Sequence, residues 1–437
     1  MDTSIRKDKF HKLKNNGNHA QLPLSNFIFY DFRPLSLDFR PFTRCFRPFM
    51  CAFRPLRVNL RPLNTTFRPF DKFTLEILPI CSQYLAYFCP FGMMKNESTR
   101  IHSLKRGVFI MKALIYNTFG GPEVLEYRDM PDPVIKQNEV LIRMKAIGLN
   151  FADVYRRKGN YHLEGNPPYI LGYEGAGIVE QVGADIEGIQ IGDRLAFADV
   201  PFANAELVAV PVDKAIPLPE TISFKDASSV LLQGLTAHYL TKDSYAVKND
   251  DVVLVHAAAG GVGQLLIQIA KLLGGKVIGL TSSKEKAMAA KEAGANRVFL
   301  YSDDWKSAVL EETHGKGVDV VYESVGSTLM DSFAATRTGG TVVFYGMAGG
   351  DPVSIDPRML MDTSKTLTGG DLWNVLTSLD QRVSRSNELL GWMAQGKIRV
   401  SKPTTFALHD GQEAHRYLES RKSTGKILLI PSTGEQI

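Results

Sequence analysis

The chain has 437 residues, with 51 Lys and Arg against 46 Asp and Glu. Hydrophobic residues make up 44% and charged residues 22%, close to the averages of globular proteins, which excludes a wholly disordered chain. At roughly 150 residues per domain, the length predicts two or three domains. The net charge of +5 averages two unlike parts, because residues 1–110 carry 18 basic and 7 acidic side chains whereas residues 111–437 carry 33 and 39.

The N-terminal part, residues 1–110, contains a seven-residue repeat. Arg-Pro recurs six times at this period, from Arg33-Pro34 to Arg68-Pro69, and Phe precedes the arginine in five of the copies. Proline removes a helical N–H donor and clashes with the preceding turn, at a cost of about 3 kcal/mol. It also favours extended geometry in the residue before it. We therefore predict an extended, disordered extension and not a coiled coil.

Several hypotheses address this extension. Its basic, Phe-rich composition suits nucleic acid or an anionic membrane, and its arginine content suits a transit peptide, although the prolines disfavour an amphipathic helix. The apolar stretch Phe73–Met94 contains Glu76, Pro79 and Pro90, which disfavour a clean membrane-spanning helix. The favoured hypothesis is translated repetitive sequence upstream of a true start at Met111, so that residues 1–110 form no domain.

The cysteines belong to the same extension. They are Cys45, Cys51, Cys81 and Cys89. The spacings within the two close pairs, six and eight residues, are not typical of a zinc site. Residues 111–437 contain no cysteine and therefore offer neither a disulfide nor a thiolate ligand for a metal.

Residues 111–437 change in pattern along their length. Short alternating strands come first, predicted at Ala113–Tyr116, Val124–Arg128, Glu139–Ile147 and Gly175–Val182. Apolar strands then alternate with helices; the strands are predicted at Val252–His256, Lys276–Leu280, Arg297–Leu300, Val318–Glu323, Thr341–Tyr345 and Leu367–Gly369, and the helices at Gly263–Leu273, Ser283–Ala293, Asp304–Thr313 and Leu329–Ala335. This alternation predicts an α/β fold with a doubly wound parallel sheet. A last strand, Lys426–Ile430, predicts that the α/β domain is inserted in the β-rich one.

The first strand of the predicted parallel sheet runs into a glycine-rich turn. The residues after His256 read Ala-Ala-Ala-Gly260-Gly261-Val262-Gly263, followed by a helical segment. In a strand–turn–helix unit, Gly260 and Gly261 let the backbone approach a pyrophosphate, which lies at the helix N-terminus, and Gly263 lets the helix pack on the strand. Ala258 replaces the first glycine of G-x-G-x-x-G, so the motif depends on its flanking strands and helix.

The end of the second strand indicates which nucleotide binds. NAD-binding folds usually place an acidic residue there, to hold the ribose 2′-hydroxyl. Thr281–Lys286 supplies hydroxyls and lysines instead, with Ser282 and Lys286 as candidates to hold a 2′-phosphate, so the sequence predicts NADPH. Glu285 weakens this inference, and a solvated helix face is the alternative interpretation of Lys284 and Lys286.

Together, these motifs resemble the zinc-independent NADPH:quinone oxidoreductases, the zeta-crystallin-like branch of the medium-chain dehydrogenase/reductase superfamily. The stretches that carry the resemblance are Gly148–Tyr155, Gly172–Gly177, Gly192–Arg194, Gln233–Tyr239 and Ala257–Gly263. The resemblance implies a GroES-like substrate domain at residues 111–238 and 373–437, and a Rossmann NADPH-binding domain at residues 239–372. It also implies a homodimer.

The departures from the zinc enzymes of that superfamily are informative. In zinc alcohol dehydrogenases a cysteine stands at the position of Asn150 and a histidine at that of Tyr173, and neither Asn nor Tyr is a usual zinc ligand. The cysteine-rich lobe of a structural zinc is also absent from the sequence. The resemblance therefore implies no metal and disfavours alcohol oxidation, which relies on the metal.

The resemblance also implies roles for single residues. Asn150 and Tyr155 match the pair that borders the nicotinamide ring, where their amide and phenol would hydrogen-bond a quinone oxygen as negative charge builds there. Ordinary polar packing at a domain boundary is the alternative for this pair. Thr236 is expected near the carboxamide. Further residues expected along the cofactor are Tyr301 at its adenosine end and Gly346 and Met347 at its nicotinamide end.

The leading predicted function is the NADPH-dependent reduction of quinones without a metal. The first alternative is an NADPH-dependent reductase of α,β-unsaturated carbonyls, and the second is a non-catalytic NADPH-binding or RNA-associated protein. The acidic balance of residues 111–437 disfavours nucleic acid, which favours basic surfaces. These residues show no signal peptide and no membrane span, so we expect a cytoplasmic protein.

Overall fold

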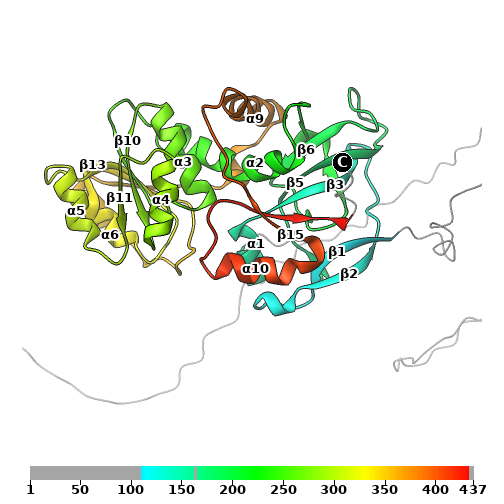
Figure 1. Cartoon of the computed structure of the whole chain (residues 1–437), viewed down its shortest axis with the longest axis horizontal. Coiled ribbons are helices and arrows are strands. Elements are labelled where there is room, and N and C mark those ends of the chain that lie inside the picture. The colour runs from blue at the N-terminus through cyan, green and yellow to red at the C-terminus, as the bar shows by residue number, and fades with distance from the viewer. Residues whose placement is uncertain (1–109, 162–164, 433–437) are drawn as a thin grey trace, which may run out of the picture. The chain divides into compact units, whose positions relative to one another are not determined.

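The computed structural model describes residues 110–161 and 165–432 (Figure 1). The predictions for the seven-residue repeat, the four cysteines and the remainder of residues 1–109 lie outside the described residues. Within the described ranges, no helix is both long enough and apolar enough to cross a bilayer.

A parallel sheet of six strands forms the α/β part. Its strands, in order across the sheet, are β11 (Arg297–Leu300), β10 (Lys276–Thr281), β9 (Val252–Val255), β12 (Val318–Glu323), β13 (Thr336–Phe344) and β14 (Thr366–Gly369). All neighbouring pairs are parallel. The chain order reverses between β9 and β12, and ligands of doubly wound sheets bind outside the carboxyl ends of the strands at such a point. The sheet confirms the predicted Rossmann domain.

Helices cover both faces of this sheet (Figure 1). They are α3 (Gly261–Leu272), α4 (Lys284–Glu292), α5 (Trp305–Glu312), α6 (Leu329–Ala335) and α7 (Pro357–Thr363). Side chains alternate between the faces along a strand, so Val253 and Val255 pack in the apolar cluster that contains Ile269 of α3. Leu254 packs on the other face with Phe333 of α6. The buried first strand thereby fixes the position of the turn that follows it.

The β-rich part contains two further sheets. The larger has the order β15 (Thr404–Ala407), β16 (Ile427–Ile430), β3 (Glu139–Leu149), β5 (Glu174–Val182), β6 (Arg194–Ala198) and β8 (Ile216–Pro217), with β7 (Leu207–Pro211) also pairing with β3. The smaller contains β2 (Glu126–Pro131), β1 (Ile110–Tyr116) and β4 (Tyr169–Ile170). Because β16 comes from the C-terminal end of the described chain and pairs with β3, the α/β part is inserted as predicted. This part is the GroES-like domain.

Five further α-helices complete the fold of the described residues, and α2 among them packs against both the β-rich sheet and α3. They are α1 (Phe151–Arg157), α2 (Phe224–Tyr239), α8 (Leu372–Val375), α9 (Leu379–Ala394) and α10 (Gly411–Glu419). One apolar cluster contains Ala176 of β5, Leu235 of α2 and Val253 of β9, so it continues from the β-rich sheet into the Rossmann sheet. The domain boundaries at residues 238/239 and 372/373 stay predictions, because this shared core crosses them.

Most predicted elements differ from the observed ones by a few residues at one end or both, and β13 begins at Thr336, five residues before its predicted start. Two of the differences have a clear local cause. The strand predicted at Val124–Arg128 begins only at Glu126, because Pro122 starts a short 3-10 turn that ends at Val124. The helix predicted from Gly263 begins at Gly261, since Gly260 is extended and acts as its N-cap. Helix α3 therefore includes two of the glycines that were predicted to form the turn.

A buried histidine links the C-terminal segment to α1 and makes folding sensitive to acid. His415 of α10 is fully buried, and its Nδ1 lies 2.9 Å from Nη1 of Arg157. Burial, and then the positive charge of Arg157, lowers the pKa of His415 to about 3. The unfolded chain binds this proton below a pH of about 6.5, so the stability is lost as the pH falls from about 6.5 towards 3.

We predict that His415→Gln reduces this acid sensitivity. Between pH 7 and pH 5, the wild-type free energy of unfolding should fall by about 2 kcal/mol more than that of the variant, because only the wild type has this group to protonate on unfolding. Urea unfolding of both proteins at the two pH values measures the difference. The other buried histidines are common to both proteins, so an equal pH dependence would show that His415 is not responsible.

Candidate active site

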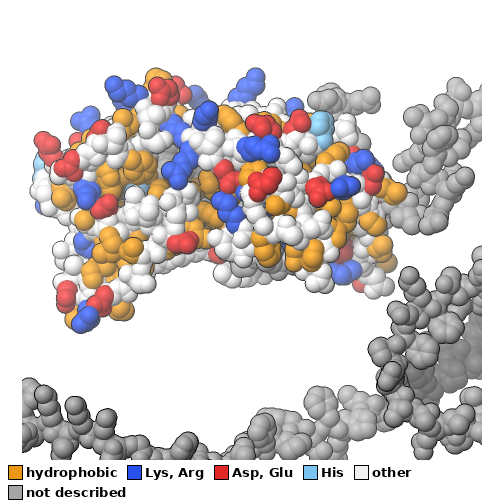
Figure 2. All heavy atoms as spheres, turned by 90° about the horizontal axis from the view of Figure 1, so that it is seen from below, with side chains coloured by type: hydrophobic (Ala, Val, Ile, Leu, Met, Phe, Trp, Pro, Cys, Tyr) orange, Lys and Arg blue, Asp and Glu red, His pale blue; other side chains and the backbone are white. Residues whose placement is uncertain are grey.

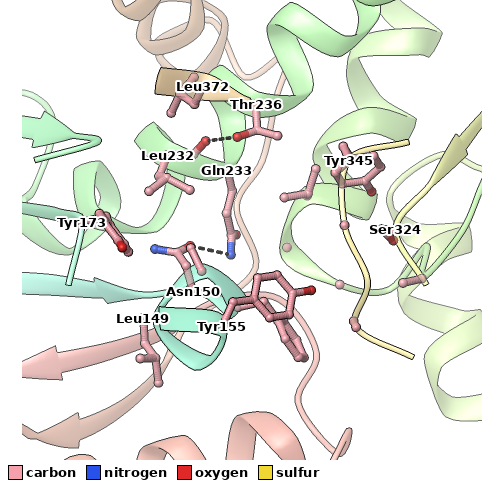
Figure 3. Close-up of a pocket in the computed structure, with 18 of the residues that line it drawn as sticks. Leu149, Asn150, Tyr155, Tyr173, Leu232, Gln233, Thr236, Ser324, Tyr345 and Leu372 are labelled. Atoms are coloured by element: carbon pink, nitrogen blue, oxygen red, sulfur yellow. Dashed lines mark hydrogen bonds between the residues drawn. The ribbon is translucent and has the colours of Figure 1, made fainter. Parts of the chain in front are cut away.

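A cavity of about 270 Å³ lies between the β-rich part and the Rossmann sheet (Figure 3). Its lining comes from α1, α2, the start of α3, the loop after β13 and the segment that contains α8. The predicted site residues among its lining are Asn150, Tyr155, Thr236, Gly260, Gly261, Val262, Gly263 and Gly346. The full lining extends from Leu149 to Ile427, so segments 278 residues apart in the sequence meet in one cavity.

The glycine turn is shaped by contacts that exclude side chains. A Cβ atom on Gly263 would lie 2.4 Å from the carbonyl oxygen of Ala257 and 2.9 Å from the Cα of Ala258, both of them backbone atoms. The lack of a side chain at Gly263 therefore permits the close packing of α3 on the turn. A Cβ atom on Gly261 would instead meet the side-chain oxygen of Gln233, and one on Gly260 would lie 3.1 Å from Ala257 O.

The N-terminus of α3 is suited to an anion. No side chain caps this end, and the first turn contains no acidic residue. The unpaired N–H groups at a helix N-terminus and the helix dipole favour negative charge. Ala257, which begins the turn, has a φ of +45°, in the left-handed region that non-glycine residues seldom adopt. The chain thus holds a strained turn against a helix start that is open to a phosphate group.

A buried polar network contacts the residues that begin this turn. His256, at the end of β9, is fully buried; its Nδ1 lies 3.1 Å from the hydroxyl of Tyr301 and its Nε2 3.0 Å from that of Ser332. Burial lowers the pKa of His256, which favours the neutral ring. Glu323, at the end of β12, accepts hydrogen bonds from Ser332 and from the N–H of Val325. The network joins the loop that follows β9 to the loop that follows β12.

Asn150 lies at the N-cap of α1 and is 4% exposed. Its Nδ2 donates to Gly148 O at 3.2 Å and to Glu174 Oε2 at 3.1 Å. Its Oδ1 accepts from the ammonium of Lys426 at 2.8 Å and from Gln233 Nε2 at 3.4 Å. Both amide protons are therefore donated within the protein, and the predicted hydrogen bond from this amide to a quinone oxygen stays a prediction.

Lys426 and Glu174 form a buried ion pair beside Asn150. Both residues are 1% exposed or less, and the Lys426 ammonium donates to Glu174 Oε2. Glu174 Oε1 also accepts from the N–H of Leu232 on α2, at 2.7 Å. Because breaking a buried pair leaves an uncompensated charge, this cluster fixes β3, β5, α2 and β16 relative to one another. No local sequence motif marks Lys426 as a member of this cluster.

Tyr155 projects from α1 towards the loop after β13 (Figure 3). Its hydroxyl oxygen accepts the N–H of Met347 at 3.1 Å, so its own proton remains available to a further acceptor. Burial raises the pKa of Tyr155, although the bond from Met347 acts in the opposite direction. The phenol is therefore protonated near neutral pH and serves as a hydrogen-bond donor. This bond ties Met347 to a residue of the cavity lining, while the predicted place of Met347 at the nicotinamide end stays a prediction.

Thr236 lines the cavity from α2. Its hydroxyl donates to Leu232 O at 2.7 Å, one helical turn earlier (Figure 3). The hydroxyl oxygen can still accept a hydrogen bond from the cavity side. Its expected proximity to a carboxamide stays a prediction.

Four predicted cofactor residues, Met347 and the three described next, lie outside the lining of the cavity. Ser282 is exposed between β10 and α4, and Lys286 of α4 donates from its ammonium to Arg421 O. Tyr301 follows β11, and its hydroxyl accepts the N–H of Ala257 at 2.9 Å. Ser282 and Lys286 thus lie close together at the end of the second strand, while Tyr301 contacts the turn itself. Their roles towards a 2′-phosphate and an adenosine stay predictions.

Aromatic side chains line the end of the cavity beside Asn150 and Tyr155. Tyr161 and Tyr173 meet edge to face at a centroid distance of 6.1 Å, and Tyr173 and Trp373 at 5.3 Å. Sequence reasoning noted Tyr173 only as a replacement for histidine and missed Tyr161 and Trp373, because no local pattern marks them. No group of three or more His, Cys, Asp or Glu side chains within residues 110–161 and 165–432 is arranged to hold a metal ion.

Two domain families match the chain. The alcohol dehydrogenase GroES-like domain matches residues 136–220, and the zinc-binding dehydrogenase domain matches residues 261–381. These matches agree with the two parts of the fold on either side of the cavity. The fold and the site thus define a member of the medium-chain dehydrogenase/reductase superfamily.

Individual relatives narrow this class. The quinone oxidoreductase of Pseudomonas aeruginosa is 39% identical over 324 residues, covering 73% of this chain and 99% of that protein. The crystal structure of Escherichia coli quinone oxidoreductase complexed with NADPH has a TM-score of 0.71 and 38% identity, covering 73% of this chain and all of that one. A 2-haloacrylate reductase from Burkholderia is 34% identical over 331 residues, covering 74% of this chain and 99% of that protein. The chain belongs to the quinone oxidoreductase family of this superfamily.

Proposed function

We propose that the protein reduces quinones with NADPH, without a metal, in the cavity between its two domains. One observation carries this proposal. The glycine turn at the N-terminus of α3 and the residues Asn150 and Tyr155 of the GroES-like domain line the same cavity. The similarity to quinone oxidoreductases, one of them complexed with NADPH, supports both the reaction and the cofactor.

The residues at the turn fit a dinucleotide phosphate. No side chain caps the start of α3, and there is no room for a Cβ at Gly263. Backbone N–H groups are therefore the surface that faces the cavity. Gly260, Gly261 and Val262 would hold the pyrophosphate, and Ser282 with Lys286 the 2′-phosphate. When bound, NADPH supplies the hydride. The loop at Gly346–Met347 would border the nicotinamide end.

At the end of the cavity beside Asn150 and Tyr155, binding of the quinone oxygen depends on polar side chains of the protein. Tyr155 is the group with an available proton, and it would donate a hydrogen bond to the acceptor oxygen as negative charge develops there. Asn150, whose amide is held by Lys426 and Glu174, would position the start of α1 and therefore Tyr155. Since burial raises the pKa of Tyr155, final protonation of the product would come from solvent.

The reduction of α,β-unsaturated carbonyls is the second candidate, because a 2-haloacrylate reductase is among the relatives. A non-catalytic RNA-associated role is disfavoured: the face shown in Figure 2 mixes Lys and Arg with Asp and Glu and presents no continuous basic surface. A homodimer and a cytoplasmic location stay predictions.

Steady-state kinetics with a panel of acceptors separates the two catalytic candidates. We expect kcat/KM for 1,4-benzoquinone and 1,4-naphthoquinone to exceed that for 2-haloacrylate and simple enals by at least about tenfold, which is about 1.4 kcal/mol in the transition state. NADPH oxidation at 340 nm is the readout, and reactions without enzyme correct for direct reduction. A higher kcat/KM for the enals would favour the second candidate.

A further inference from the structure

A continuous series of hydrogen bonds links the glycine turn to a buried carboxylate on the neighbouring strand. The hydroxyl of Tyr301 accepts the N–H of Ala257 at 2.9 Å and lies 3.1 Å from Nδ1 of His256. The other ring nitrogen of His256, Nε2, lies 3.0 Å from the hydroxyl of Ser332, which donates its proton to Glu323. The series therefore ends on Ala257, which begins the turn, and on Glu323 of β12.

The protons of this series can be assigned. Burial lowers the pKa of His256, so its ring is neutral and has one donor and one acceptor nitrogen. Ser332 has a single hydroxyl proton and gives it to Glu323, so its oxygen accepts from Nε2 of His256. Nδ1 is then the acceptor, and it takes the proton of the Tyr301 hydroxyl, whose oxygen accepts from Ala257. Every link thus pairs one donor with one acceptor.

The first end of the series holds a strained residue. Ala257 has a φ of +45°, and a non-glycine residue keeps such a conformation only where its surroundings fix it. Its carbonyl oxygen accepts the N–H of Gly260 at 2.8 Å and closes the turn, while its own N–H is donated to Tyr301. Without the bond to Tyr301, Ala257 could relax and shift the start of α3, where the phosphates of NADPH would bind.

The second end of the series fixes the loop that follows β12. Glu323 Oε1 accepts the N–H groups of Val325 at 2.6 Å and of Gly326 at 3.1 Å. In the same loop, Ser324 lines the cavity (Figure 3), and its carbonyl oxygen accepts the N–H of Ala348 at 3.0 Å. Ala348 belongs to the loop after β13, which would border the nicotinamide. One carboxylate thus supports both ends of the proposed cofactor site.

We propose that His256 and Glu323 are positioning residues of the NADPH site, which hold its phosphate end and its nicotinamide end in one fixed arrangement. Both side chains are fully buried and neither lines the cavity, so they act through the residues that they hold. The inference rests on the proposed function, because it concerns the cofactor of the same site. His256 serves the phosphate end, whereas Glu323 serves both ends, and this difference can be measured.

The first test compares two uncharged replacements of His256 that have nearly the same shape. In His256→Asn the side-chain oxygen can take the place of Nδ1 and accept from Tyr301, whereas His256→Leu offers no acceptor. Fluorescence titration should show a Kd for NADPH that rises at least about tenfold in His256→Leu and less than about threefold in His256→Asn. If His256→Leu does not fold, His256→Gln takes its place, since its amide lies at the position of Nε2 and leaves Tyr301 without an acceptor.

The matched control is His415→Leu. His415 is also fully buried, but it does not line the cavity and takes no part in the series. This variant should lower the free energy of unfolding and leave the Kd for NADPH unchanged. A similar loss of NADPH affinity in His415→Leu would mean that any buried histidine has this effect, and it would overturn the inference.

The second test separates the two ends of the site by steady-state kinetics with 1,4-naphthoquinone. His256→Leu should raise KM for NADPH about tenfold and change kcat less than about twofold. Glu323→Gln should raise KM and also lower kcat about tenfold, because its loop borders the nicotinamide end. Equal Kd values in His256→Leu and His256→Asn, or an unchanged kcat in Glu323→Gln, would overturn this inference alone. A wild type that does not bind NADPH would overturn the proposed function as well.

Discussion

Gly263→Ala should greatly lower the affinity of the protein for NADPH. The added Cβ would lie 2.4 Å from Ala257 O and within 3.0 Å of two backbone atoms of Ala258, and none of these atoms belongs to a side chain that can rotate away. Overpacking of this kind costs about 1–3 kcal/mol, and the turn would have to move away from the start of α3. We expect the Kd for NADPH to rise roughly 100-fold, about 2.7 kcal/mol.

The control for this variant is Gly391→Ala in α9. A Cβ at Gly391 has nothing within 4 Å, and alanine is favoured over glycine in a helix by about 1 kcal/mol. This variant should be as stable as the wild type or more so, with unchanged NADPH affinity. Fluorescence titration with NADPH and thermal unfolding of both variants give the comparison. Normal NADPH affinity in Gly263→Ala would mean that the turn does not hold the cofactor.

The double variant Tyr155→Phe, Asn150→Ala should lose most of its quinone turnover while it still binds NADPH. Removing a donor that stabilises developing negative charge typically lowers kcat about 100-fold or more. We expect a loss of this order in kcat for 1,4-naphthoquinone and a change below about threefold in the Kd for NADPH. The single variant Tyr155→Phe should account for most of the loss, because the Asn150 amide protons are already donated to Gly148 and Glu174.

Asn150→Ala alone should mainly affect stability. It removes the oxygen that accepts from the buried Lys426 ammonium, and an unsatisfied buried donor costs about 1–3 kcal/mol. Tyr417→Phe is a matched control, since Tyr417 of α10 packs its ring against Phe406 of β15 and does not line the cavity. Full turnover in the double variant would refute the role of the pair, and a loss confined to Asn150→Ala would move the donor role from Tyr155 to Asn150.

The fold and the phosphate end of the site could be predicted because their signals are local. Alternating apolar strands and helices predict the doubly wound sheet, and the turn at Gly260–Gly263 has its strand, glycines and helix within one continuous segment. At the turn itself the start of α3 was placed two residues too late, since the first glycines are also acceptable at a helix N-terminus.

The acceptor end could not be predicted in the same way. Tyr155 and Met347 are 192 residues apart, and their contact depends on how the two domains pack. Asn150 and Lys426 are 276 residues apart, and their contact depends on the return of the C-terminal segment to the β-rich sheet. Trp373 stands in a four-residue helix without a recognisable motif. Family resemblance identified Asn150 and Tyr155 as neighbours of the ring, but the use of the Asn150 amide by a buried ion pair is visible only in three dimensions.

A hydride passes from NADPH to a quinone in this cavity without a metal, according to the proposed function. The most direct measurement is the rate of NADPH oxidation with 1,4-naphthoquinone, by protein dialysed against a chelator and checked for residual zinc. We predict turnover that is unchanged by chelation, that is stronger with NADPH than with NADH, and that falls in Tyr155→Phe. Turnover that disappears with the chelator and returns with zinc, or no quinone-dependent oxidation of NADPH, would contradict the proposed function.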